Sequence, residues 1–280
     1  MKLLADGGST KADWVAIDDK GQEVFRTRTQ GINPEILDEV EIRERFEQNY
    51  ELKNIRNEVK ELYFYGAGCG TDRSKQFLRN EFQKYFENAE IHIHDDMLAA
   101  VYAASGGKES IVCILGTGSN SCYFDGQKIT QKLVSLGYML MDEASANYFG
   151  KQLIRDYFYH RMPEEIAFAF ENKFNLNPDE IKRNLYKEST PNSYLGEFAT
   201  ILFDFKESEY VRNMLKSGFK EFYDCRVLCY EKKQDVPIYF IGSIAFFFED
   251  ILKDVAQELN LTFGGVVQRP IDGLIKYHRK

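Results

Sequence analysis

Two short segments of the sequence, about half a chain apart, share one pattern that limits the folds open to this chain. Each is an apolar run that breaks into glycine and hydroxyl residues and then resumes as a second apolar run. The first spans residues 3–17 and breaks at Asp-Gly-Gly-Ser-Thr (residues 6–10); the second spans residues 113–124 and breaks at Gly-Thr-Gly-Ser-Asn (residues 116–120). Both predict a β-hairpin with a glycine turn. The repeat indicates a duplicated nucleotide-binding fold that holds phosphates between its two copies.

Strands alternate with helices along both halves of the chain, which favours a mixed α/β sheet in each half. In the first half, we expect three strands within residues 2–30, strands at 62–65 and 91–94, and helices at 38–53, 71–87 and 97–104. In the second half, we expect strands near 110–116, 120–125, 127–134, 237–241 and 261–263, helices near 145–161, 163–174, 178–187, 193–203, 208–232 and 245–259, and a terminal helix from about Pro270. The Gly106-Gly107 pair is the candidate domain hinge.

Composition narrows the class of protein. With 280 residues, the chain is long for one compact core, and two domains are the natural expectation. The net charge of −8 argues against a nucleic-acid-binding surface, which needs a basic stripe. No apolar run approaches the ~20 residues of a membrane span, and no targeting segment is expected at the N-terminus. The five cysteines are odd in number and form no Cys-x-x-Cys pair. We therefore expect a cytoplasmic protein without nucleic-acid or membrane partners.

The turn at residues 6–10 has the chemistry of a phosphate site. It offers two hydroxyls and backbone N–H groups that can approach a phosphate without obstruction by a Cβ atom. Asp6, at the end of the strand, can hold Mg²⁺ through water, because this ion keeps much of its hydration shell. An ordinary β-turn with an Asx hydrogen bond is the structural alternative. Because Gly116, Thr117 and Gly118 repeat the pattern, we favour phosphate binding.

Two other sites that the sequence suggests are less favoured, and one common phosphate motif is absent. Residues 66–70 (Gly-Ala-Gly-Cys-Gly) follow a strand, but their spacing differs from the Gly-x-Gly-x-x-Gly of dinucleotide sites, and no acidic residue ends a strand about twenty residues later. His92 and His94 share a strand face but lack a third clear metal ligand. The P-loop motif Gly-x-x-x-x-Gly-Lys-Ser/Thr does not occur.

An acidic pair, Asp95 and Asp96, ends a strand before an alanine-rich helix. A carboxylate at that position is a good helix N-cap. Two adjacent acids do not usually both cap, so the other can accept the proton of an alcohol as phosphoryl transfer proceeds.

A second acidic pair, Asp142 and Glu143, also precedes a helix. These residues could supply paired acceptors for the vicinal hydroxyls of a sugar, or Asp142 or Ser145 could cap the helix. Asn33 and Asn120 can each bind both donors and acceptors of a polar ligand. Local chemistry alone leaves these alternatives open.

In their order along the chain, these segments resemble the superfamily of acetate and sugar kinases, Hsp70 and actin. More narrowly, they resemble its branch of N-acetylglucosamine kinases and related benzoyl-CoA-reductase-type ATPases. The matching segments are residues 6–11 (first phosphate motif), 31–34 (the segment whose Asn binds the sugar), 95–100 (the Asn/Asp-Asp-Ala-x-Ala-Ala element), 115–120 (second phosphate motif with its Ser-Asn sugar contacts), 137–145 (the Trp-Gly-His-Met-x-Gly-Asp-Glu-Gly-Ser stretch) and 240–243 (adenosine loop).

The resemblance implies a fold and its domains. It implies an α/β fold of two ribonuclease-H-like (actin-like ATPase) domains, with duplicated mixed sheets flanked by helices around a hinged cleft. The first domain would be residues 1–106, completed by the terminal helix at 268–280. The second would be residues 107–267, with a helical insertion. A homodimer is common in the families that the chain resembles.

The resemblance also implies roles for individual residues, with ATP and Mg²⁺ as cofactors. Asp96 would act as the catalytic base and contact the sugar, and Asp6 would hold Mg²⁺. Contacts to ATP would come from the two phosphate motifs and the adenosine loop: Gly8, Ser9, Thr10, Lys11, Gly116, Thr117, Gly118, Gly242 and Ser243. Further contacts to the sugar would come from Asn33, Ser119, Asn120, Gly137 and Asp142.

We therefore expect ATP-dependent phosphorylation of an amino sugar, N-acetylglucosamine or a related hexosamine, at the 6-position. The alternative is a non-kinase ATPase of the same fold that drives or activates a partner protein; a third possibility is an inactive nucleotide or sugar sensor. The sequence departs from the family at Tyr138 and Met141, and at residues 201–205, where large apolar side chains replace a small-residue helix. These departures concern the sugar and adenine contacts rather than the phosphate motifs.

Overall fold

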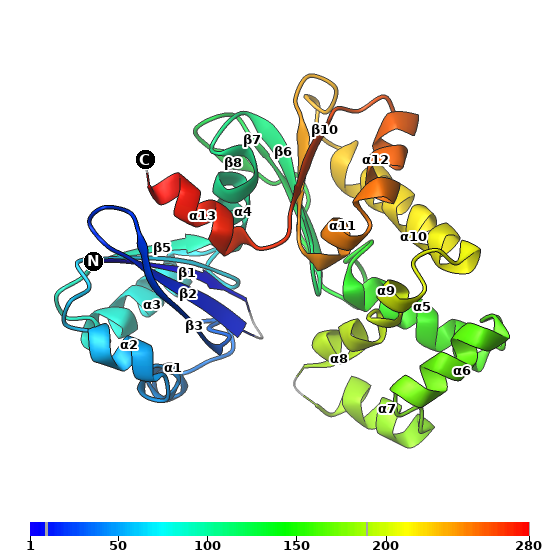
Figure 1. The fold of residues 1–280 in the computed structure, drawn as a ribbon, viewed down its shortest axis with the longest axis horizontal. Helices are drawn as coiled ribbons and strands as arrows, with labels where there is room; N and C mark the ends of the chain where they lie inside the picture. Colours follow the sequence, from blue (N-terminus) through cyan, green and yellow to red (C-terminus); the bar gives the residue numbers. More distant parts are fainter. Residues whose placement is uncertain (9–10, 189, 280) are drawn as a thin grey trace. The chain divides into compact units, whose positions relative to one another are not determined.

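The computed structural model describes residues 1–8, 11–188 and 190–279. The chain divides into two compact units, Met1–Gly107 with Arg269–Lys280, and Lys108–Gln268 (Figure 1). Each unit is built on one mixed sheet of five strands.

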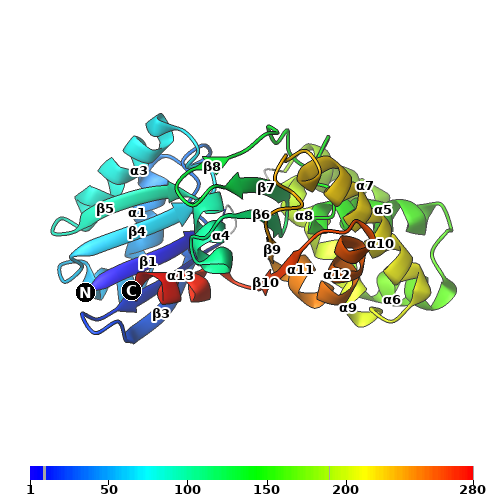
Figure 2. The same cartoon turned by 90° about the horizontal axis from the view of Figure 1, so that it is seen from above.

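In the first unit, the sheet has the order β3-β2-β1-β4-β5. Its strands are β1 (Lys2–Gly7), β2 (Lys11–Ile17), β3 (Glu23–Gln30), β4 (Glu61–Gly66) and β5 (Glu90–Asp95). The first three pair antiparallel, whereas β1, β4 and β5 run parallel. Helices α1 (Glu39–Glu47), α2 (Tyr50–Ile55) and α3 (Asp72–Tyr85) pack on one face, and α4 (Asp96–Ser105) and the terminal α13 (Pro270–His278) on the other (Figure 2).

The core of this unit explains why the sheet is covered on both faces. Trp14, Phe46, Phe64 and Phe82 form an aromatic cluster beneath α1 and α3, and each is at most 1% exposed. Burying each of these side chains contributes about 2–3 kcal/mol. Trp14 keeps its polar end satisfied, because its Nε1–H donates to Thr29 Oγ1 at 3.0 Å.

The second unit repeats this topology. Its strands are β6 (Ser110–Leu115), β7 (Ser119–Phe124), β8 (Ile129–Thr130), β9 (Ile238–Ile241) and β10 (Phe263–Val267), in the order β10-β9-β6-β7-β8. The hairpin strands β6, β7 and β8 pair antiparallel and β6, β9 and β10 run parallel, as in the first unit. The predicted α/β fold of duplicated mixed sheets flanked by helices is confirmed.

Between β8 and β9 the second unit carries a block of helices (Figure 1). They are α5 (Ala146–Phe158), α6 (Glu164–Lys173), α7 (Pro178–Tyr186), α8 (Pro191–Phe198), α9 (Ile201–Asp204), α10 (Glu209–Phe222) and the π-helix η1 (Tyr223–Val227). Helices α11 (Ser243–Phe247) and α12 (Glu249–Glu258) follow β9. None of the helices within the described ranges has the length and apolar character that crossing a bilayer requires.

Some predicted elements differ in extent from the observed ones. The predicted helix at 38–53 is two helices, because Asn49 caps α2 by accepting the Leu52 N–H at 3.0 Å. The predicted helices at 193–203 and 245–259 are each divided in two, and the one at 208–232 changes to π geometry after Phe222. The predicted strand at 127–134 shrinks to Ile129–Thr130.

Candidate functional site

The turn between β1 and β2 is the first predicted phosphate site. The Gly8 N–H donates to the Lys11 carbonyl at 2.8 Å, which closes the turn. The Lys11 side chain is exposed. Ser9 and Thr10, also predicted to contact ATP, lie outside the described residues. The phosphate role of Gly8 and Lys11 stays a prediction.

Glycine is required where β1 and β4 end. Gly7 and Gly66 lie opposite each other in register. A Cβ atom at either position would lie 2.3 Å from the ring of Phe64, which is fully buried. The two glycines therefore let an aromatic side chain fill the sheet face beneath the strand ends.

Asp6 lies beside this point, next to Gly7 and opposite Asp13 of β2. Burial, followed by the Asp96 and Asp13 carboxylates, raises the pKa of Asp6 to about 7, and Lys11 opposes this shift. Three carboxylates, those of Asp6, Asp13 and Asp96, therefore influence one another here, and a divalent cation would reduce their repulsion. Among the described residues, no group of three or more His, Cys, Asp or Glu side chains could hold a metal ion. A single carboxylate can still hold Mg²⁺ that keeps most of its waters, and the Mg²⁺ role of Asp6 stays a prediction.

The two acids at the junction of β5 and α4, Asp95 and Asp96, have different roles in the structure. The Asp95 side chain accepts the Leu98 N–H at 2.9 Å and caps α4. Asp96 is the first residue of the helix, and burial followed by the Asp95 charge raises its pKa to about 6, although the N–H groups of Met97 and Asp96 oppose this shift. Asp96 is therefore the acid that is not used as the cap. Asp95 lies opposite Gly66, which lies opposite Gly7, so Asp6 and Asp96 lie at the same edge of the sheet, and the Asp96 charge raises the pKa of Asp6.

Asn33 follows β3 in a tight turn. Its Oδ1 accepts the Glu35 N–H at 2.9 Å, and its carbonyl accepts the Ile36 and Leu37 N–H groups at 3.2 and 3.1 Å. Gly68, with φ of 77°, approaches so closely that a Cβ there would lie 2.0 Å from Asn33 Oδ1. Within the glycine run at 66–70, Gly68 therefore has a structural purpose: it packs against the Asn33 segment.

The turn between β6 and β7 is the second predicted phosphate site. The Gly116 N–H donates to the Gly118 carbonyl at 3.0 Å. The start of α5 binds the outer side of this turn: Ala146 N–H donates to the Gly116 carbonyl at 2.9 Å, and Asn147 Nδ2 to the Thr117 carbonyl at 2.7 Å. The Thr117 side chain is exposed. The turn is thus fixed by its carbonyls, while the Thr117 residue stays exposed.

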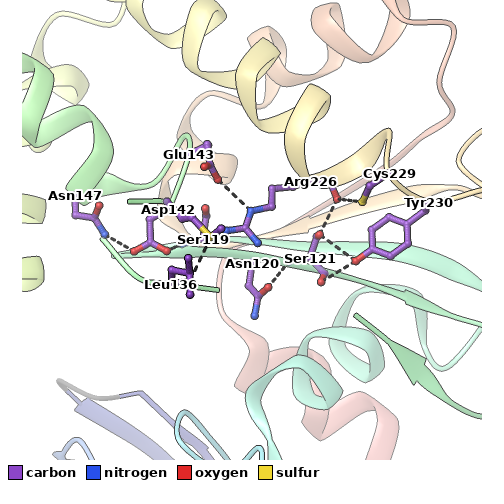
Figure 3. A network of polar contacts seen from close by, with 11 residues as sticks. Ser119, Asn120, Ser121, Leu136, Asp142, Glu143, Asn147, Arg226, Cys229 and Tyr230 are labelled. Atoms are coloured by element: carbon purple, nitrogen blue, oxygen red, sulfur yellow. Dashed lines mark hydrogen bonds and ion pairs between the residues drawn. The ribbon is translucent and has the colours of Figure 1, made fainter. Parts of the chain in front are cut away.

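Asp142 lies against this turn in an unusual backbone conformation (Figure 3). Its φ of 69° is left-handed, which is uncommon for a residue other than glycine. Its Oδ1 accepts the Ser119 N–H at 3.3 Å, and its Oδ2 accepts from Asn147 Nδ2 at 2.9 Å. A Cβ atom at Gly118 would lie 2.9 Å from Asp142 Oδ2. Helix capping is the task of Ser145, whose Oγ accepts the Tyr148 N–H.

The other predicted sugar contacts lie on the elements around Asp142. Ser119 and Asn120 begin β7; Ser119 is buried, and Asn120 Oδ1 accepts the Ser121 N–H at 2.9 Å. Gly137, with φ of 78°, begins a turn in which its carbonyl accepts the N–H groups of Leu140 and Met141.

The predicted adenosine loop lies at the end of β9. Gly242 has φ of 115°, and a Cβ there would lie 2.3 Å from the Leu115 carbonyl oxygen. The Gly242 N–H donates to the Val267 carbonyl at 3.1 Å, and Ser243 is exposed. Within the second unit, the loop therefore touches the end of β6, directly before the turn at residues 116–118.

No pattern in the sequence marks Arg226. This residue lies on η1 and is 1% exposed; its Nε donates to Glu143 Oε2 at 3.0 Å (Figure 3). Its position in a helical segment resembled that of an ordinary surface arginine. The acidic residue beside Asp142 is the one local signal in the sequence for a cation at this place.

The chain is similar to solved structures that are named as N-acetylglucosamine kinases. A solved structure from Porphyromonas gingivalis, assigned by name to the N-acetylglucosamine kinases, is 35% identical, with a TM-score of 0.93 over 100% of this chain and 99% of that one. A second, from Chromobacterium violaceum and assigned to the same kinases, is 12% identical with a TM-score of 0.70 over 99% and 98% of the two chains, which shows the fold alone. No family model matches the sequence.

One curated protein is also similar, the N-acetyl-D-glucosamine kinase of Dictyostelium discoideum. It is 28% identical over 166 residues, which are 54% of this chain and 51% of that protein. The match therefore spans about half the length of this curated relative.

Proposed function

The chain belongs to the N-acetylglucosamine kinase-like branch of the sugar kinase, Hsp70 and actin superfamily, and we propose that it transfers the γ-phosphoryl group of ATP to a hydroxyl of an amino sugar. The observation that carries this proposal is the division between Asp95 and Asp96. One caps the helix, and the other keeps a carboxylate of raised pKa whose charge in turn raises the pKa of Asp6.

In the proposed reaction, Asp96 acts as the general base. The sugar oxygen attacks the γ-phosphorus, the bond from that phosphorus to the β–γ bridging oxygen breaks, and the hydroxyl proton passes to Asp96. The acceptor that we propose is the 6-hydroxyl of N-acetylglucosamine or a related hexosamine. Mg²⁺, held by Asp6 through water, would neutralise charge on the phosphate oxygens when bound.

Two sets of residues would orient the reactants. For ATP, we propose the residues of the two turns and the adenosine loop: Gly8, Ser9, Thr10, Lys11, Gly116, Thr117, Gly118, Gly242 and Ser243. For the sugar, we propose Asn33, Ser119, Asn120, Gly137 and Asp142. The Asp142 carboxylate is already fixed by two N–H donors, so its remaining lone pairs can accept sugar hydroxyls at little entropic cost.

We place the protein in the cytoplasm because all five of its cysteines are free, and we propose a homodimer. Light scattering coupled to size-exclusion chromatography would measure the oligomeric state.

The test of function is ADP release across a panel of sugars: N-acetylglucosamine, glucosamine, N-acetylmuramic acid and glucose. Asp96→Asn should lower sugar-dependent turnover by about 10²–10⁴-fold while ATP binding persists, because only the proton acceptor is lost. Asp95→Asn is the matched control, since asparagine caps a helix as well as aspartate does. Turnover that needs no sugar and survives Asp96→Asn would favour the alternative, an ATPase that drives a partner protein.

A further inference from the structure

Unpaired polar atoms gather at one place in the second unit. Among the described residues, four buried side-chain nitrogen or oxygen atoms have no hydrogen-bond partner: Ser119 Oγ, Asn147 Oδ1, and Nη1 and Nη2 of Arg226. All belong to residues bonded to Asp142 or to its neighbour Glu143. An unpaired buried donor costs stability, so this arrangement needs an explanation other than stability.

Arg226 is anchored to β7 by its backbone. The η1 helix is a π-helix, a form often found at functional sites. Ser121 Oγ donates to the Arg226 carbonyl at 2.7 Å, and Tyr230 Oη donates to the Ser121 carbonyl at 3.0 Å. Because side chains alternate along a strand, Ser119 faces the same side of β7 as Ser121. The Arg226 side chain therefore starts from the face of β7 that also carries Ser119.

The other end of the Arg226 side chain holds a strained turn. Glu143 lies between Asp142 and Ala144, whose φ angles of 69° and 58° are both left-handed. Two strained residues in one turn persist only where surrounding contacts impose them. The contacts here are the Ser119 N–H and Asn147 Nδ2 on Asp142, and the Arg226 Nε on Glu143. The side chains of Arg226 and Glu143 are 2% and 13% exposed, so solvent screens this pair little.

We propose that Arg226 is a positioning residue for sugar binding. Through Glu143 it holds the turn at residues 142–144, and so aims the Asp142 carboxylate at the sugar. This inference rests on the proposed function, which assigns Asp142 to the sugar. A merely structural role explains the pair poorly, because two apolar side chains commonly replace a buried ion pair without loss of stability, and here two guanidinium nitrogens stay unpaired.

The decisive variant removes both charges at once, Arg226→Met with Glu143→Met. Removing both avoids leaving one buried charge alone, so the fold should survive with an unchanged melting temperature. The KM for the sugar should rise about 10- to 100-fold, because Asp142 is no longer held in place. The KM for ATP should stay within about twofold, and kcat should change less than the sugar KM.

The matched control is the exposed pair Arg212–Asp250 of the same unit, which joins α10 and α12 at 3.0 Å. Arg212→Met with Asp250→Met should leave the KM for both substrates unchanged. Arg226→Lys keeps a cation beside Glu143 and should recover most of the sugar affinity. Wild-type sugar KM in the folded double variant at 226 and 143 would overturn the proposal.

A measurement without substrates separates this inference from the proposed function. Hydrogen exchange at the Ser119 and Ser145 amides, which bond to Asp142, should be faster in the Arg226→Met, Glu143→Met protein and also in Arg226→Met alone. Unchanged exchange at both amides would show that Arg226 does not hold the turn. A wild-type protein that phosphorylates no sugar would refute the proposed function, yet the exchange result would still decide what Arg226 does.

Discussion

Asp95 and Asp96 have the same side chain and adjacent positions, but the helix start gives them different tasks. The Asp95 carboxylate accepts the Leu98 N–H and so caps the helix. Asp96 lies one residue later, inside the first turn, where burial and the neighbouring charge raise its pKa to about 6. A base works only when deprotonated, and a pKa near the working pH combines availability with proton affinity.

This shift predicts the acid limb of the pH profile. Below about pH 6 Asp96 is protonated, so kcat/KM for the sugar should fall tenfold per pH unit. Burial is the larger cause and the Asp95 charge the second. Asp95→Asn should therefore move the limb to lower pH without moving it to the value of a free aspartate. Rates measured from pH 4.5 to 8 in both proteins check this; an unmoved limb would assign it to another group.

At the scale of an element, the β6–β7 turn needs glycine at position 118, whereas some other glycines of the chain can be replaced by alanine. Gly118→Ala would place a methyl group 2.9 Å from Asp142 Oδ2. We expect a loss of about 1–3 kcal/mol in the free energy of unfolding, and a raised sugar KM because Asp142 must move. Gly70→Ala is the control, since nothing lies within 4 Å of its added Cβ. Denaturant unfolding and sugar kinetics measure both; equal effects of the two changes would contradict this account.

The sequence predicts elements well where the signal is local. Both hairpins follow from apolar runs with a glycine turn, and the β5–α4 junction follows from its acidic pair. The break between α1 and α2 does not follow from a local pattern, because Asn49 also donates to Thr27 Oγ1 and to the Arg28 carbonyl, on a strand distant in sequence. Arg226 was missed for the same reason: its partner Glu143 is 83 positions away, and no local pattern marks a buried arginine.

At the scale of the whole molecule, the duplication matters most. Both units have the same topology: three antiparallel strands, the first of which also runs parallel to two later strands. Each therefore ends its first strand at a glycine turn, next to the carboxyl ends of parallel strands where ligands commonly bind. The repeat in the sequence predicts this fold class. It does not predict which acids and amides each unit fixes by hydrogen bonds.

The proposed function assigns phosphate contacts to turns in both units, so ATP binding should depend on residues of each. Mg²⁺-ATP at about 100 times its Kd should stabilise the protein by about 2.7 kcal/mol, seen as a rise in melting temperature. Asp6→Asn in the first unit and Thr117→Val in the second should each reduce that rise, measured from the variant's own baseline. The exposed Asp19→Asn and Thr130→Val are matched controls that should keep it. If only one unit's variant reduced the rise, ATP would not be using both turns, and the duplicated pattern would lose its functional meaning.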